Sequence, residues 1–233
     1  MSQKENSQID KTADDKYKIA VCLSGGGYRA ALFHLGALRR LNELGILGRV
    51  DTLSSVSGGS ILSAHLAACL KKQPFVDNKI PDWENLVAAP FRRFCKRDIR
   101  TIPVLKRFLL PWNWPKRSTQ VNALMHRYER YLTDMKLMDL PEHPNFVYCA
   151  TDIVYGINWV FERTRVGDYS NRYIKTPSDW KVARAVAASS CFPPVFDPMP
   201  IGQLFVKETR KQEKKITDKE NLLPKVRFEV PPI

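Results

Sequence analysis

Two strand-like runs, each followed at once by a small-residue turn and a helical segment, constrain the fold of this chain more than any other feature. Lys18–Leu23 (KIAVCL) is followed by the turn Ser24–Gly27, and Val50–Val56 (VDTLSSV) leads into the turn Ser57–Gly59. Strand, helix, strand and helix in this order predict a parallel sheet with right-handed crossovers. The chain is therefore expected to have an α/β fold.

The segments after both turns have helical patterns. The first repeats leucine at helical spacing, at Leu32, Leu35, Leu38, Leu41 and Leu44. Gly45 is expected to end this helix, because glycine takes the left-handed conformation without a steric penalty. A second helix is expected over roughly Ser60–Leu70.

The rest of the chain changes character several times. Residues 71–145 lack strand signals, and we expect an insertion of helices and loops there. Asn145–Asp152 (NFVYCATD) resumes the strand pattern, and Trp159–Thr164 is expected to pair near it. Trp180–Ser189 is predicted to be a helix that ends before Pro193.

Length and composition favour a single large domain. The chain has 233 residues, of which 44% are hydrophobic, and this is enough for one sizeable core. We expect a flexible polar tail at 1–16, the folded domain at 17–206 and a charged tail outside the core at 207–233. The N-terminus has no apolar signal core, and no stretch approaches the roughly 18 to 20 apolar residues that span a bilayer. We therefore predict a cytoplasmic protein with at most a peripheral contact to a membrane.

The cysteines indicate neither a disulfide framework nor a metal site. They are odd in number and form no C-x-x-C pair: Cys22, Cys69, Cys95, Cys149 and Cys191. Cys22 and Cys149 lie inside strand-like runs, so we expect them to be buried free thiols.

The formal net charge is +13, and much of the surplus lies in residues 91–117. This segment carries nine Lys or Arg residues and a single acid, Asp98, and its aromatic residues are Phe91, Phe94, Phe108, Trp112 and Trp114. One interpretation is an interfacial segment on an anionic membrane surface. The other is a helical insertion whose aromatic residues fill the core. No recognised nucleic-acid-binding module is present, so no specific nucleic acid is expected as a partner.

The glycine turn Ser24–Gly27 leaves backbone N–H groups unobstructed at a helix N-terminus, where an anion binds. The anion could be the pyrophosphate of a dinucleotide, because Gly25-x-Gly27-x-x-Ala30 resembles a dinucleotide fingerprint, or the oxyanion of acyl transfer. The dinucleotide interpretation needs an acid at the end of the next strand, about 20 residues on. That strand ends in Ser-Ser-Val without a carboxylate. A glycine loop that merely turns the chain is the third interpretation.

The second turn, Ser55-Val56-Ser57-Gly58-Gly59, stands where a nucleophile elbow belongs, between a strand and a helix. Such an elbow holds its central residue in a strained conformation, with small residues two before and two after it. A helix N-cap is the alternative role for Ser57. The elbow is favoured because the ends of consecutive parallel strands face the same crevice, where a nucleophile and backbone donors would meet.

A catalytic triad would need a histidine well after the serine in the chain. None of the four histidines ends a late strand, and each is expected to be structural or exposed: His34, His65, His126 and His143. A dyad of serine and carboxylate would explain this.

Four sequence blocks in order resemble the bacterial patatin-like phospholipases: CLSGGGYRAALFHLGAL, SSVSGGSILSAHLA, YCATDIVYGINWVF and ARAVAASSCFPPVF. The resemblance covers roughly Lys18–Pro200. It implies a three-layer α/β/α fold with a mainly parallel central sheet and a Ser–Asp dyad that needs no metal or cofactor. It also implies hydrolysis of acyl esters of phospholipids or neutral lipids, so a lipid ester is the expected substrate.

Carried over by position, the resemblance makes Ser57 the nucleophile that attacks the ester carbonyl. The N–H groups of Gly26, Gly27 and Gly58 would form the oxyanion hole. Gly25, Arg29 and Gly59 would be supporting residues. Asp152 matches a family strand position and is expected to be structural.

The chain departs from the family at the catalytic aspartate, which stands in a D-G-G or D-G-A motif after the Phe-Pro-Pro block. No aspartate here is followed by glycine: Asp197 precedes a proline, and Asp218 lies in the charged tail. We therefore expect a truncated product or divergence after about Pro200, an incomplete C-terminal part of the fold, and impaired catalysis. Head group, acyl specificity and oligomeric state are not predicted.

Overall fold

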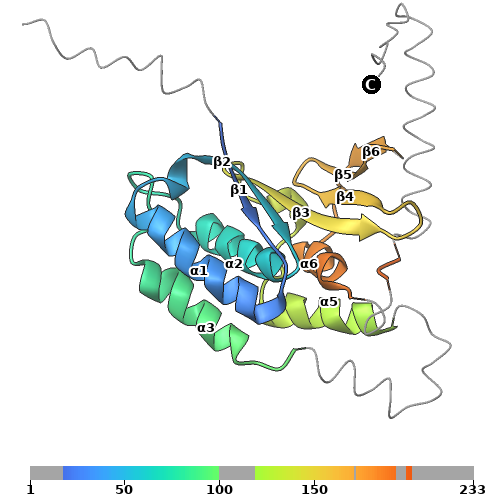
Figure 1. Ribbon diagram of the computed structural model, residues 1–233, viewed down its shortest axis with the longest axis horizontal. Helices are drawn as coiled ribbons and strands as arrows, with labels where there is room; N and C mark the ends of the chain where they lie inside the picture. The colour runs from blue at the N-terminus through green and yellow to red at the C-terminus, as the bar shows by residue number, and fades with distance from the viewer. Residues whose placement is uncertain (1–17, 100–118, 171, 193–197, 201–233) are drawn as a thin grey trace, which may run out of the picture.

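The protein folds around a six-stranded mixed sheet with strand order β1-β2-β3-β4-β5-β6 (Figure 1). The computed structural model describes residues 18–99, 119–170, 172–192 and 198–200. The strands are β1 (Ile19–Leu23), β2 (Val50–Val56), β3 (Asn145–Asp152), β4 (Ile157–Phe161), β5 (Arg165–Asp168) and β6 (Arg172–Lys175). The α-helices are α1 (Gly27–Glu43), α2 (Gly58–Lys72), α3 (Ala89–Cys95), α5 (Thr119–Tyr131) and α6 (Val182–Ser190). Shorter helical turns are η1 (Leu47–Arg49), η2 (Glu84–Ala88) and η4 (Leu137–Asp139).

The sheet has a parallel half and an antiparallel half. Leu53 of β2 pairs in parallel register with Val21 of β1 and with Phe146 of β3. From β3 onward the strands are antiparallel, with Tyr148 opposite Phe161 of β4. The predicted α/β class is confirmed, and the predicted parallel arrangement describes the first three strands. The later strands are joined by tight turns, and such connections allow only antiparallel pairing.

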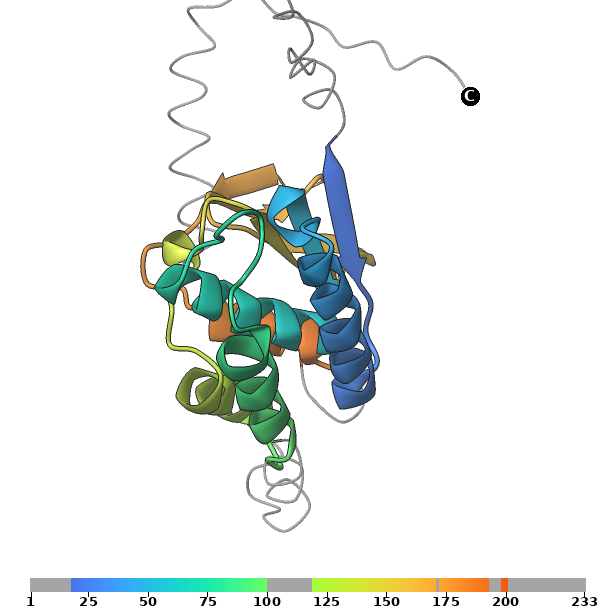
Figure 2. The ribbon, with the colours of Figure 1, turned by 90° about the vertical axis from the view of Figure 1, so that its left-hand side faces the viewer.

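The described helices lie on one side of the sheet, as Figures 1 and 2 both show. The strand residues that point towards them are buried and, with the inner faces of α1, α2 and α6, form the core. Examples from the strands are Leu23, Leu53, Phe146, Tyr148 and Phe161. The described residues thus supply the sheet and one helical layer of the α/β/α arrangement.

The β1 residues whose side chains point away from the helices are exposed, and this corrects one prediction. Cys22 was expected to be a buried thiol, but it is exposed, as is Ala20. Cys149 on β3 is half-buried. The reason is that successive side chains alternate between the two faces of a strand, and no described helix covers the face on which Cys22 lies.

Helix α1 buries only part of its leucine repeat. Leu35 and Leu38 are buried, whereas Leu32 and Leu44 are 41% and 53% exposed. A repeat of three residues falls short of the 3.6-residue helical turn, so it winds around the helix instead of staying on one face. Gly45 follows the helix end with a φ of 71°, as predicted for a glycine stop.

The described parts of residues 71–145 form helices and turns. Phe91 and Phe94 of α3 are 0% and 5% exposed, so these two aromatic residues fill the core and do not face a membrane. Phe108, Trp112 and Trp114 lie outside the described residues, as do the predicted tails 1–16 and 207–233. No helix in the described part of the chain is long and apolar enough to cross a bilayer.

Candidate active site

Ser57 stands between the end of β2 and the start of α2, in a backbone conformation that L-residues rarely adopt. Its φ is 50° and its ψ is −110°. It occupies the N-cap position of α2, but its side chain makes no capping hydrogen bond. An ordinary N-cap has an extended backbone and uses its hydroxyl to cap the helix. The geometry therefore supports the elbow over the capping serine, because strain of this kind persists only where the surrounding structure imposes it.

The two glycines after Ser57 allow backbone segments to approach closely. A Cβ atom at Gly58 would lie 2.2 Å from the carbonyl oxygen of Gly27, and one at Gly59 would lie 2.4 Å from that of Leu23. Neither position has room for a side chain. The elbow is thus packed against the end of β1 and the start of α1, and the predicted proximity of the two turns is confirmed.

The glycine loop lies directly beside the elbow. A Cβ atom at Gly25 would lie 3.3 Å from the Cβ atom of Ser57. Gly26 and Gly27 have φ values of 131° and 65°, which favour glycine. Gly26, at the N-cap of α1, has no side chain with which to cap the helix, and a helix N-terminus of this kind suits an anion. Arg29 lies in the first turn of α1, and its side chain is exposed.

His34 of α1 contacts Ser24, the first residue of the glycine loop. His34 is 7% exposed, and its Nε2 lies 3.1 Å from the carbonyl oxygen of Ser24, to which it donates a hydrogen bond. The hydroxyl of Ser24 lies 3.3 Å from the same nitrogen. This contact gives His34 the structural role that the sequence predicted, and fixes the entry to the loop.

The other three histidines also have partners within the fold. His65 contacts the carbonyl oxygen of Val87, His143 contacts that of Gly48, and His126 pairs with Glu129. Burial is the main cause that lowers the pKa of His65, so its ring is neutral near pH 7. None of these contacts places a histidine at Ser57.

Ser189, near the end of α6, ties the elbow to β3. Its Oγ accepts the N–H of Ser57 at 2.8 Å and donates to the carbonyl oxygen of Cys149 at 2.6 Å. The Oγ of Ser60 lies 2.9 Å away and also bonds to the Oγ of Ser55 at 3.2 Å. Sequence reasoning assigned no role to Ser189. The only available signal was the run of small residues at the end of a predicted helix.

An apolar pocket of about 720 Å³ lies beside the elbow, between the carboxyl ends of β2 and β3 and the end of α6. Val56 and Ser189 both line it, so the pocket adjoins Ser57 along the chain and through the Ser57–Ser189 hydrogen bond. Its apolar walls include Ile153, Val154, Trp159, Phe161 and Met199. A pocket with such walls accepts an apolar chain.

Asp152 lines the same pocket, but its carboxylate stabilises a turn. Its Oδ1 accepts the N–H of Val154 at 2.8 Å and that of Tyr155 at 3.4 Å. This is a side-chain cap of the β3–β4 turn. It agrees with the structural role that the sequence assigned to Asp152. Asp197 and Asp218 lie outside the described residues.

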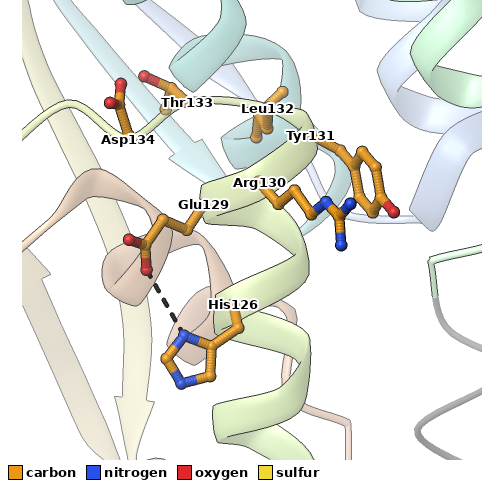
Figure 3. A pocket seen from close by; sticks show the side chains of 7 residues that line it. All are labelled: His126, Glu129, Arg130, Tyr131, Leu132, Thr133 and Asp134. Carbon is orange, nitrogen blue, oxygen red and sulfur yellow. Dashed lines mark ion pairs between the residues drawn. The ribbon is translucent and has the colours of Figure 1, made fainter.

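A second hollow, of about 600 Å³, lies at the end of α5 and is formed by a single stretch of chain, residues 126 and 129–134 (Figure 3). In it His126 Nδ1 lies 3.6 Å from a Glu129 carboxylate oxygen. No strand end or glycine loop contributes to this hollow, and we assign it no catalytic role. Within the described ranges, no group of three His, Cys, Asp or Glu residues is arranged to hold a metal ion.

Comparison with known proteins supplies a family match. The sequence model of the Patatin family, described as patatin-like phospholipase, matches residues 21–211. A solved structure of human GIVD cytosolic phospholipase A2 with methyl gamma-linolenyl fluorophosphonate and terbium chloride has a TM-score of 0.49 and 19% identity to this chain, and the alignment covers 76% of this chain and 30% of that one. VipD from Legionella pneumophila has a TM-score of 0.38 and 13% identity, with coverage of 80% and 44%. This chain therefore spans less than half the length of either solved chain. The search of curated proteins found no significant match.

Proposed function

Because this chain belongs to the patatin-like phospholipase family, we propose that it is a lipid acyl hydrolase with Ser57 as the nucleophile. The observation that carries the proposal is the strained backbone of Ser57 at the end of β2, directly beside the glycine loop that opens α1. Acyl transfer needs a nucleophile and a set of fixed N–H donors at one place. These two turns bring both to the same edge of the sheet.

In the proposed reaction, the Oγ of Ser57 forms a bond to the ester carbonyl carbon. The N–H groups of Gly26, Gly27 and Gly58 stabilise the resulting oxyanion, and loss of one such donor typically costs about 3 kcal/mol of barrier. Collapse of the intermediate breaks the ester C–O bond, and the alcohol leaves with the proton that the Ser57 hydroxyl loses when its Oγ bonds to carbon. Water then hydrolyses the acyl–serine ester and releases the fatty acid.

The surroundings of Ser57 suit a lipid ester. The neighbouring pocket has apolar walls, and burial of an acyl chain there contributes about 0.8 kcal/mol for each CH₂ group removed from water. We assign Arg29, exposed in the first turn of α1, a supporting role near the oxyanion loop. Asp152 is assigned to the turn that it caps, not to proton transfer.

The rate of this reaction depends on a base for the Ser57 proton, because serine at its free pKa is a weak nucleophile. The chain contains no D-G-G or D-G-A motif, which is where the family's aspartate stands. For a protein made of these 233 residues alone, we therefore propose slow acyl transfer, driven by the oxyanion hole and by substrate binding. Such sites retain roughly 10³- to 10⁴-fold acceleration over water, which is orders of magnitude below a complete site.

A fluorophosphonate probe tests the nucleophile directly, since phosphonylation forms a stable Oγ–P bond and releases fluoride. Peptide mass spectrometry after long incubation should locate the adduct on Ser57. The adduct should be absent in Ser57→Ala and retained in Ser54→Ala. Ser54 is a matched control, because it lies on the same strand and its hydroxyl contacts Cys149 at 3.5 Å.

Two results would count against the proposal. Labelling that persists unchanged in Ser57→Ala would remove Ser57 as the nucleophile. Turnover of short-chain nitrophenyl esters at an ordinary enzymatic rate by this chain would instead contradict the slow reaction, and Asp152→Asn and Asp197→Asn would then identify the base.

A further inference from the structure

Three consecutive apolar residues are exposed at the tip of the β3–β4 turn. Ile153, Val154 and Tyr155 have exposed fractions of 56%, 82% and 61%. Turns are normally built from Gly, Pro, Asn, Asp and Ser, so a run of this kind at a turn is unusual. Because the Asp152 carboxylate binds the N–H groups of Val154 and Tyr155, the turn is held in place and presents these side chains to solvent.

Two more aromatic residues are exposed in this part of the fold: Tyr169 follows the carboxyl end of β5, and Phe192 directly follows Cys191, which lines the pocket. Tyr169, in the turn between β5 and β6, is 74% exposed, and Phe192, which follows α6, is 68% exposed. The carboxyl ends of β3 and β5 lie at one edge because both strands are antiparallel to β4. We call this set, together with Val56, the apolar rim: Val56, Ile153, Val154, Tyr155, Tyr169 and Phe192.

The apolar rim is continuous with the pocket beside the candidate nucleophile. Val56, Ile153 and Val154 line that pocket and are also 43%, 56% and 82% exposed. Val56 directly precedes Ser57. Apolar side chains of the rim are therefore exposed to solvent and also form part of the pocket wall.

We propose that the apolar rim docks this protein on the surface of a lipid bilayer. The inference rests on the proposed function, because a lipid ester reaches Ser57 most directly from a bilayer against which the pocket opens. Exposed apolar surface beside a pocket marks an interaction site. Tyrosine suits a bilayer interface, because its ring is apolar and its hydroxyl stays hydrated.

A bilayer fits this surface better than a protein partner does. A protein seated on the apolar rim would close the pocket that the rim borders, whereas a bilayer supplies the apolar chains that the pocket accepts. The aromatic residues of the other candidate membrane segment that the structure describes, Phe91 and Phe94, are buried in the core. Docking by the apolar rim depends on apolar burial, so it requires no anionic lipid.

Vesicle co-sedimentation tests the proposal, with phosphatidylcholine vesicles and the full chain carrying Ser57→Ala, so that hydrolysis cannot alter the lipid. Val154→Asp should weaken partitioning by about tenfold or more, because a charge replaces an apolar side chain that would be buried. Val76→Asp is the matched control. Val76 is 57% exposed, but its turn lies at the other edge of the sheet, where Asn78 bonds to Gly48 just before β2.

Several outcomes would overturn the docking surface. These are no binding by the parent chain, an equal loss in both variants, or binding that needs phosphatidylglycerol and disappears at high salt. Self-association that Val154→Asp abolishes, without any vesicle binding, would assign the rim to protein contact instead. If Val154→Asp melts at a lower temperature than the parent chain, vesicle binding is measured instead with the variants Tyr155→Ser and Tyr169→Ser. Retained vesicle binding in these variants refutes the proposal. Lost vesicle binding with a normal melting temperature supports it.

The two proposals fail separately. Fluorophosphonate labelling reports on Ser57 in solution without vesicles, and vesicle binding is measured in a chain that lacks Ser57. Labelled Ser57 with no vesicle binding would remove the docking surface alone. Rim-dependent binding without labelling would remove the nucleophile and leave a lipid-binding surface.

Discussion

The two edges of the central sheet are built in different ways. At the carboxyl edge, β1 and β2 end in the glycine loop and the strained elbow, and the turn after β3 exposes apolar side chains. At the amino edge, the connections carry ion pairs and polar contacts. Arg163 pairs with Glu142 at 2.7 Å, and Lys71 pairs with Asp139 at 3.3 Å.

The residues with positive φ make the same contrast. Near the amino edge, Asp77 and Asn78 have φ values of 49° and 62°. Asp and Asn tolerate this region because their short side chains bond locally to the backbone. At the carboxyl edge the residue is Ser57, with a φ of 50°, and it is held there by contacts from β1, α1 and α6. The amino edge uses residues that are ordinary in turns, whereas the carboxyl edge imposes backbone strain on one serine.

The largest expected effect concerns the close packing of the elbow. Gly58→Ala places a Cβ 2.2 Å from a backbone oxygen that cannot rotate away, so we expect a loss of about 3 kcal/mol in the free energy of unfolding. Gly36→Ala is the control, because a Cβ there meets nothing within 4 Å. That change should stabilise α1 by about 0.5 to 1 kcal/mol. Urea unfolding of both variants measures the difference, and equal effects would mean that the elbow is not tightly packed.

Ser189→Ala tests the hydrogen bonds that hold the elbow. The change leaves the Ser57 N–H and the Cys149 carbonyl without this partner, so we expect a loss of about 1 to 3 kcal/mol. Fluorophosphonate labelling of Ser57 should slow as well, since the backbone that aims its hydroxyl loses a support.

The control for Ser189→Ala is its neighbour in the chain. Ser190 is also buried, at 5% exposure, but its hydroxyl has no hydrogen-bond partner among the described residues. Ser190→Ala should therefore be neutral or slightly stabilising. If both variants lose the same stability, the effect of Ser189 is one of packing and not of hydrogen bonding.

Substitutions of Asp152 show whether its carboxylate caps a turn or acts as a catalytic base. Asp152→Asn keeps the Oδ1 acceptor for the Val154 N–H, so labelling of Ser57 and stability should change little. Asp152→Ala removes the acceptor and should cost about 1 kcal/mol, measured by thermal unfolding. A large loss of ester hydrolysis in Asp152→Asn, with normal stability, would show that the carboxylate takes part in the reaction.

The smallest effect is expected at the amino edge. Glu142→Gln breaks an ion pair in which the two side chains are 81% and 37% exposed. Solvent screens such pairs, so the change in unfolding free energy should stay below about 1 kcal/mol and shrink further at high salt. A loss as large as that of Ser189→Ala would contradict the difference drawn between the two edges.

The elements that carry the candidate site follow from local sequence. The strand bounds Val50–Val56 and Asn145–Asp152 agree with the structure, and the two turns lie where small residues interrupt a strand and a helix. Glycine and a run of apolar residues act on the backbone nearby, so these features are encoded within a few residues. For this reason the sequence predicts Ser57 as the candidate nucleophile.

Contacts between distant segments could not be derived in the same way. Ser189 lies 132 residues from Ser57, and nothing local to either residue indicates that they meet. Whether Phe91 faces the core or Cys22 faces solvent depends on which helix covers which face. The same holds for the apolar rim, whose members come from four separate parts of the chain. The sequence by itself determined the strand-turn-helix units and the candidate nucleophile, because backbone preferences are local. Only the tertiary structure decided what surrounds that nucleophile, because burial and exposure depend on packing between elements far apart in the chain.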